Sequence, residues 1–116
     1  MKEQFKDILS LDDVKGVIVV GTNGQIVFQS FATAPAKPFT EQDFHKLIQG
    51  LSTVVEVELM YENIRLYIRK FAKGFVIIVM GRYALVSMVR LNCDILLSTL
   101  SSESEKPKGI GRFFKR

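Results

Sequence analysis

The fold is decided by one stretch of sequence, Gly16-Val-Ile-Val-Val-Gly-Thr-Asn-Gly-Gln25. Its four consecutive apolar residues predict a strand over residues 14–21 that is buried on both faces. The Asn-Gly pair is the strongest short-range signal for a β-hairpin, because both residue types tolerate positive φ. We therefore expect a returning strand at Ile26–Phe31. A two-residue Asn-Gly loop would place Val20 opposite Val27.

The remaining elements follow from hydrophobic periodicity and turn residues. Thr40 is a natural N-cap, and the apolar residues after it have helical spacing. Two prolines in residues 32–39 indicate a loop. The expected helices cover residues 2–11, 41–52 and 84–100, and the further strands cover residues 54–61, 64–71 and 75–81. The element order is then αββαβββα.

The order of strands in the sheet follows from which strands are apolar on both faces. Residues 14–21 and 75–81 have this pattern, which places them side by side in the centre. The hairpin at residues 54–71 alternates instead, so it lies outside them. A two-residue turn at residues 62–63 pairs residues whose numbers sum to 125, with apolar pairs on one face and charged residues, such as Glu56 opposite Arg69, on the other. Glu62 is a poor residue for such a turn, so a wider loop is the alternative. The strand at residues 54–61 is then an edge, and pairing with a second copy would cover it.

The closing helix at residues 84–100 carries its apolar residues on or near one face; they are Leu85, Met88, Val89, Leu96, Leu97 and Leu100. Arg90 and Asp94 have i, i+4 spacing and are expected to pair on its polar side. Cys93 lies among the apolar residues and is predicted to be a small buried side chain.

Composition divides the 116 residues into a domain at residues 1–101 and a basic tail at residues 102–116. Residues 106–116 hold five basic and no acidic side chains, whereas the rest hold 11 basic and 12 acidic ones. The positive mean hydropathy of +0.18 indicates that some apolar surface lies in an interface. A single cysteine and a charged start without an apolar leader favour a cytoplasmic protein.

No catalytic or cofactor-binding constellation emerges from the residue types. His45 is the only histidine and has no neighbouring nucleophile or ligand, so we expect it to be exposed or in an interface. Asn92, Cys93 and Asp94 are successive helical residues that point about 100° apart and cannot converge. No metal-ligand set and no phosphate-binding glycine motif is present. The sequence predicts a non-catalytic binding protein with no cofactor and no metal.

The tail is the feature that folding does not explain. It combines five positive charges with two adjacent aromatic residues. It could be a solvated end, a docking segment for an acidic protein, or a contact with an anionic membrane, and nucleic acid is the least favoured partner. The candidate contact residues are Lys106, Lys108, Arg112, Phe113, Phe114, Lys115 and Arg116.

The element order, together with the opening run of residues 16–25, resembles the roadblock (dynein light-chain) family, and most of all its members that regulate small GTPases. The similarity covers residues 2–100 and rests on order and spacing rather than on one motif. It implies an α/β (α+β) domain of the roadblock/profilin-like class, with a five-stranded antiparallel sheet covered by helices on both faces.

The resemblance also implies a function. Members form homodimers or heterodimers through the helix and edge strand that correspond to residues 41–52 and 54–61. They act as scaffolds or regulators for small Ras-like GTPases, or as dynein-associated light chains. An adaptor that contacts a membrane or the cytoskeleton through its basic tail is the alternative. The implied dimer contacts are His45, Gln49, Val55, Glu56, Val57, Glu58 and Leu59.

Overall fold

The computed structural model describes residues 2–32, 40–51, 53–61 and 64–104. Five antiparallel strands form one sheet in the order β2-β1-β5-β4-β3. The strands are β1 (Val14–Gly21), β2 (Ile26–Phe31), β3 (Glu56–Tyr61), β4 (Ile64–Phe71) and β5 (Gly74–Met80). The helices are a 3-10 turn at Lys2–Phe5 that leads into α1 (Lys6–Leu9), then α2 (Glu41–Gln49) and α3 (Val86–Ser104).

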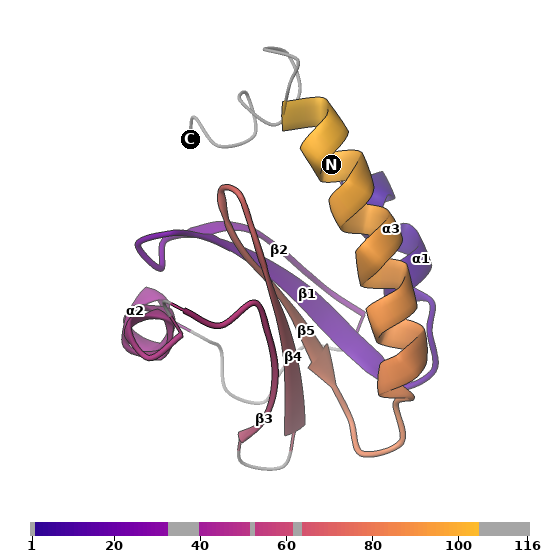
Figure 1. Ribbon diagram of the computed structural model, residues 1–116. Coiled ribbons are helices and arrows are strands. Elements are labelled where there is room, and N and C mark those ends of the chain that lie inside the picture. The colour runs from indigo at the N-terminus through magenta and orange to yellow at the C-terminus, as the bar shows by residue number, and fades with distance from the viewer. Residues whose placement is uncertain (1, 33–39, 52, 62–63, 105–116) are drawn as a thin grey trace.

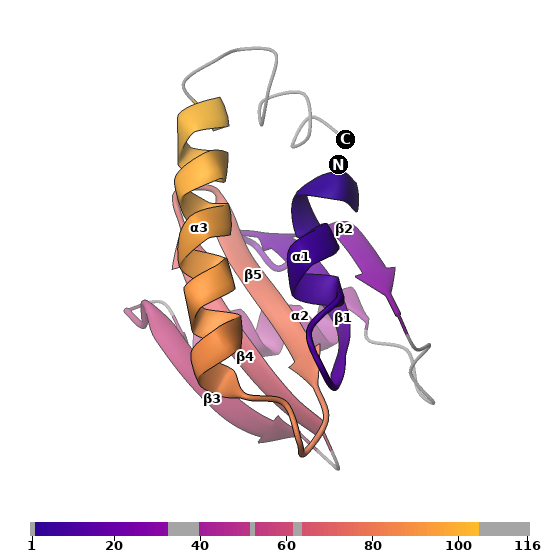
Figure 2. The same cartoon turned by 90° about the vertical axis from the view of Figure 1, so that its right-hand side faces the viewer.

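Helices cover both faces of the sheet, as the sequence predicts. Helix α2 packs on one face, and α1 and α3 lie together on the other (Figures 1 and 2). Two hydrophobic clusters result, one around Phe44 and Ile48 below α2 and one around Val89 and Cys93 below α3. The predicted element order and the antiparallel five-stranded sheet are therefore confirmed.

The two central strands are buried on both faces. Val17–Val20 are completely inaccessible in β1, and every residue of β5 is buried. The two strands pair from Val14 opposite Met80 to Gly21 opposite Gly74. The prediction that these apolar strands lie side by side in the centre is confirmed.

The β1–β2 turn differs from the predicted two-residue loop. Gly24 has a φ of 89°, and its N–H donates to the carbonyl of Gly21 at 3.0 Å. Thr22 and Asn23 thus occupy the corners of the turn, and Gly24 takes the left-handed position that follows. The register shifts after Val19, so Val20 lies opposite Ile26 and not opposite Val27. One extra turn residue is accommodated as a bulge.

Helix α2 begins where its capping residue predicts. Thr40 and Asp43 form a reciprocal capping box, with N···O distances of 3.2 and 3.0 Å. The helix ends at Gln49, three residues earlier than predicted, because the chain turns at Gly50. Phe44 and Ile48 are its buried residues, and the stripe to which they belong faces the sheet.

Helix α3 buries part of the face that the sequence predicts. Val89, Cys93 and Leu96 are buried, as predicted. Leu85 and Met88, which were predicted on the same face, are exposed. The expected pair between Arg90 and Asp94 does not form, because each side chain reaches the sheet instead. The helix extends to Ser104, past the boundary between domain and tail expected at residue 101.

Candidate functional site

Strand β3 is an open edge of the sheet. In the described part of the chain it pairs with β4 alone, from Glu56 opposite Arg69 to Tyr61 opposite Ile64, in the predicted register. The N–H of Lys70 donates to the carbonyl of Val55 at 2.8 Å. Backbone groups of odd-numbered residues therefore point toward β4, because hydrogen-bonding direction alternates along an antiparallel strand. The N–H and C=O groups of Glu56, Glu58 and Met60 point outward, where a further strand could pair with them.

Side chains alternate between the two faces of this edge strand. Val57 and Leu59 are half-buried in the cluster below α2, and Val55, just before the strand, is 66% exposed. Glu56 and Glu58 point to the opposite face. A strand added at this edge would meet apolar side chains on the α2 face and carboxylates on the α3 face.

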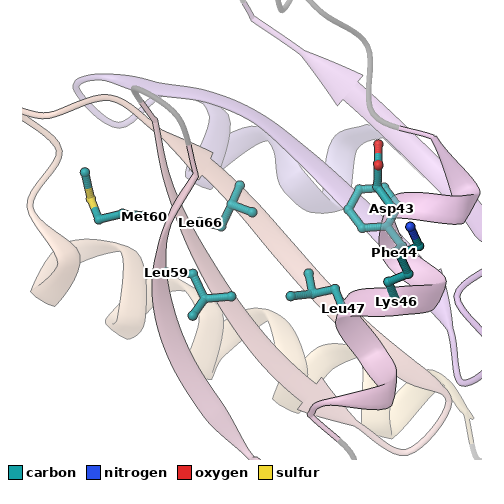
Figure 3. Close-up of a pocket in the computed structure, with 7 residues that line it drawn as sticks. All are labelled: Asp43, Phe44, Lys46, Leu47, Leu59, Met60 and Leu66. Carbon is teal, nitrogen blue, oxygen red and sulfur yellow. The ribbon is translucent and has the colours of Figure 1, made fainter.

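A pocket of about 350 Å³ lies between α2 and β3, next to this edge. In Figure 3 the side chains of Leu47 and Leu59 point toward each other across it, and Met60 points away. The charged groups of the lining come from one side of α2. Its lining residues are Asp43, Phe44, Lys46, Leu47, Leu59, Met60 and Leu66. A mostly apolar hollow beside unpaired backbone groups is suited to holding side chains of another protein.

The side of α2 away from β3 is fixed to the β1–β2 hairpin. The His45 imidazole Nδ1 lies 3.1 Å from the carbonyl oxygen of Asn23, and the Gln49 amide lies 3.3 Å from His45 Nε2. A Cβ on Gly24 would stand 2.8 Å from the Cα of His45, so glycine permits this close approach. His45 and Gln49 are exposed, and His45 contacts the hairpin. The α2 residues that line the pocket are Asp43, Phe44, Lys46 and Leu47.

The carboxylate of Glu56 joins the edge strand to α3. It accepts hydrogen bonds from the Tyr67 hydroxyl and from Arg90 Nε, the latter at 2.6 Å. Both bonds lower the pKa of Glu56, the one from Tyr67 most. Arg69 lies opposite Glu56 on β4, as predicted, but its side chain forms its hydrogen bonds elsewhere. It donates to Asp94 at 2.7 Å and to the Tyr67 hydroxyl at 3.1 Å. The charges of this face are thus satisfied within the domain.

Arg65 fixes the other carboxylate of the edge. Its Nε lies 2.6 Å from Glu58, and one terminal nitrogen donates to the carbonyls of Gly81, Arg82 and Ala84 at 3.3, 3.2 and 2.9 Å. The side chain therefore connects β3 to the loop before α3. The periodicity of β4 places Arg65 on this face, but nothing in the sequence indicates the backbone partners.

Cys93 is the only cysteine of the chain. Cys93 is completely buried, and this burial raises the pKa of its thiol to about 12. Across residues 2–32, 40–51, 53–61 and 64–104, no group of three or more His, Cys, Asp or Glu residues could hold a metal ion. No helix in the described ranges has the length and apolar character needed to cross a membrane. The seven predicted tail contacts lie outside the described residues.

Known structures share this fold. A structure of MglB with a tetrameric arrangement superposes with a TM-score of 0.73 at 14% identity and covers 87% of this chain and 85% of that one. The gliding protein MglB of Thermus thermophilus gives 0.67 at 14% identity, covering 82% and 81%. A Roadblock/LC7 domain from Streptomyces avermitilis gives 0.67 at 9% identity, covering 88% and 95%. No protein-family model and no curated protein matches the sequence.

These superpositions identify the class of domain, because each covers more than four-fifths of both chains. The chain has the roadblock/LC7 fold. Among its structural neighbours are the MglB proteins, and MglC from Myxococcus xanthus also superposes, with a TM-score of 0.53 at 16% identity.

Proposed function

We propose that this chain is a non-catalytic, dimeric scaffold or regulator that binds a small Ras-like GTPase. The observation that carries the dimer is the open β3 edge beside the apolar pocket under α2. The GTPase is inferred from the roadblock/LC7 fold and from the MglB and MglC neighbours. The subunits are two copies of this chain, or one copy and a second roadblock-type subunit.

The geometry of the edge supports dimer formation by strand addition. The outward backbone groups of Glu56, Glu58 and Met60 from two antiparallel copies can bond to one another. Because only the even-numbered residues bond outward, Val57 and Leu59 of both copies then lie on the same face as both α2 helices. The partner's apolar side chains would cover the open side of the pocket. Such pairing also removes an exposed edge that would otherwise favour aggregation.

A proline at residue 60 tests this arrangement. Met60→Pro removes an outward N–H that bonds to nothing within the β3–β4 ladder, and prolines are tolerated on edge strands. Met60→Ala is the matched control, because it removes the same side chain and keeps the N–H. Analytical ultracentrifugation should give twice the 13.1 kDa chain mass for the wild type and the control, with at least a tenfold weaker dimer for the proline variant. Equal dimer affinity of both variants, with unchanged circular dichroism, would exclude the edge.

The GTPase requires a separate experiment. The immobilised chain is incubated with native cell extract supplemented with either GDP or a non-hydrolysable GTP analogue, and retained proteins are identified by mass spectrometry. We expect a Ras-like GTPase to be retained, more strongly in one nucleotide state. Absence of any such protein under both conditions would contradict this part of the proposal and leave the dimer intact.

A further inference from the structure

Helix α3 presents a second apolar surface, on the side away from the sheet. One residue just before α3 and three residues of the helix form an apolar stripe at helical spacing. The stripe runs for three turns. We call it the α3 stripe. Its members, with their exposed fractions, are Leu85 (66%), Met88 (42%), Leu91 (54%) and Ile95 (61%).

The outward direction of the α3 stripe is fixed by contacts on the inner side and one flank of the helix. Val89, Cys93 and Leu96 are buried against the sheet. Arg90 and Asp94 hold the flank through Glu56 and Arg69, at 2.6 and 2.7 Å. Burying the stripe by rotating α3 would break both ion pairs and expose the inner residues.

Between Val86 and Thr99, both charged residues of α3 are paired with the sheet. Over that range, the exposed or half-exposed polar residues other than Arg90 and Asp94 are Ser87, Asn92, Ser98 and Thr99. The last turn of the helix also contains Glu103. Directly before the stripe, Arg82 is exposed and Tyr83 is 76% exposed. After Ser104 the sequence has Glu105, and then five basic residues and a Phe-Phe pair within residues 106–116.

We propose that the α3 stripe docks on an anionic lipid bilayer, with the basic residues of the tail adding electrostatic attraction. The stripe from Leu85 to Ile95 is apolar, and exposed Arg82 and Tyr83 precede it, which is a feature of helices that lie in a membrane interface. Residues 103–116 contain five basic and two acidic side chains, and this net positive charge complements acidic lipid headgroups. A second copy fits less well, because four half-exposed side chains cover much less than the roughly 800 Å² per partner of a stable interface.

The α3 stripe and the basic residues of the tail contribute in different ways. Each Lys or Arg close to an anionic surface strengthens partitioning roughly fivefold, so five can contribute on the order of 10³-fold, and salt weakens them. The α3 stripe contributes by transfer of apolar surface out of water, which salt does not weaken. The proposal therefore predicts a salt-sensitive part that depends on the tail and a salt-resistant part that depends on α3.

Sedimentation of the full-length chain with vesicles separates these parts. The vesicles are pure phosphatidylcholine or a 3:1 mixture of phosphatidylcholine and phosphatidylserine. We expect strong sedimentation with the mixture and weak sedimentation with phosphatidylcholine alone. Leu91→Gln combined with Ile95→Gln should weaken binding at least tenfold, whereas the matched control, Leu91→Met with Ile95→Leu, should bind like the wild type. Neutralising the tail to Gln in the full-length chain should remove the preference for phosphatidylserine; the changed positions are Lys106, Lys108, Arg112, Lys115 and Arg116.

Three results would overturn the proposal. The first is no sedimentation of the wild type with phosphatidylserine vesicles. The second is unchanged binding of the double glutamine variant, which would assign binding to the tail alone. The third is a smaller solution mass of that variant without a change in vesicle binding, which would make the α3 stripe a contact between protein subunits. Circular dichroism checks that each variant is folded.

Discussion

Removing the Tyr67 hydroxyl should destabilise the domain and change how its stability depends on pH. The side chain is 1% exposed, and its hydroxyl donates to Glu56 and accepts from Arg69 at 3.1 Å. Tyr67→Phe leaves both charged groups with one hydrogen bond fewer. The Nε of Arg69 is already buried without a partner among the described residues.

The size of the effect follows from these two bonds. A hydrogen bond to a charged group contributes about 1.5–3 kcal/mol when buried. The Glu56 side chain is 35% exposed, so water replaces part of its lost bond, while Arg69 is 16% exposed and loses more. We expect Tyr67→Phe to lower the free energy of unfolding by about 2 kcal/mol at pH 7.

The pH dependence has a defined sign. The Tyr67 hydroxyl, followed by Arg90, lowers the pKa of Glu56 below its ordinary value of 4.5. The stability that this bond provides is therefore fully present above pH 4.5 and is lost as the pH falls through the lower pKa of the folded state. The destabilisation caused by Tyr67→Phe should be largest near neutral pH and smaller in acid.

Urea denaturation followed by circular dichroism measures both effects, at one protein concentration and at pH 7 and about pH 3. Tyr83→Phe is the matched control, because Tyr83 is 76% exposed. If Tyr67→Phe lowers the free energy of unfolding by less than about 0.5 kcal/mol at pH 7, the hydroxyl does not stabilise the domain through Glu56 and Arg69. Equal losses at the two pH values would show that it does not act on the Glu56 carboxylate.

Two further predictions concern a thiol and a helix cap. The pKa of Cys93, raised to about 12 by burial, should leave the native thiol unreactive toward Ellman's reagent at pH 8, with full reaction in urea; rapid modification of the native protein would show that α3 opens easily. Thr40→Ala should lower the free energy of unfolding by about 1 kcal/mol, since it breaks the capping box with Asp43. The exposed Thr53→Ala is its control in the same urea titration, and equal losses would show that the cap contributes nothing.

Much of the sheet could be predicted because side-chain period and burial agree along most strands. The alternation of Val57 and Leu59 with charged residues determined the β3–β4 register, and a one-residue slip would have reversed both faces. The β1–β2 bulge could not be predicted in this way. Val20 is buried whether it lies opposite Val27 or Ile26, so the pattern does not distinguish the two registers.

The candidate site was predictable as a strand and a helix but not in its contacts. Spacing identifies Leu47 as part of the apolar stripe of α2, yet only the tertiary arrangement shows that it borders a pocket rather than the interior. The same limit applies to Arg90 and Asp94. An i, i+4 pair is worth only a few tenths of a kcal/mol, so the strand partners Glu56 and Arg69 prevail.

The position of β5 between β1 and β4 has a consequence for synthesis of the chain. Partner residues of β1 and β5 lie between 53 and 66 positions apart in the sequence, from Gly21–Gly74 to Val14–Met80. Translation proceeds from the N-terminus, so β1 is made long before the strand that completes its second side. During that interval the nascent chain presents an apolar strand with one free edge to chaperones and to neighbouring copies. The sheet is therefore expected to be completed only after β5 has been synthesised, whichever segment is the first to form local structure.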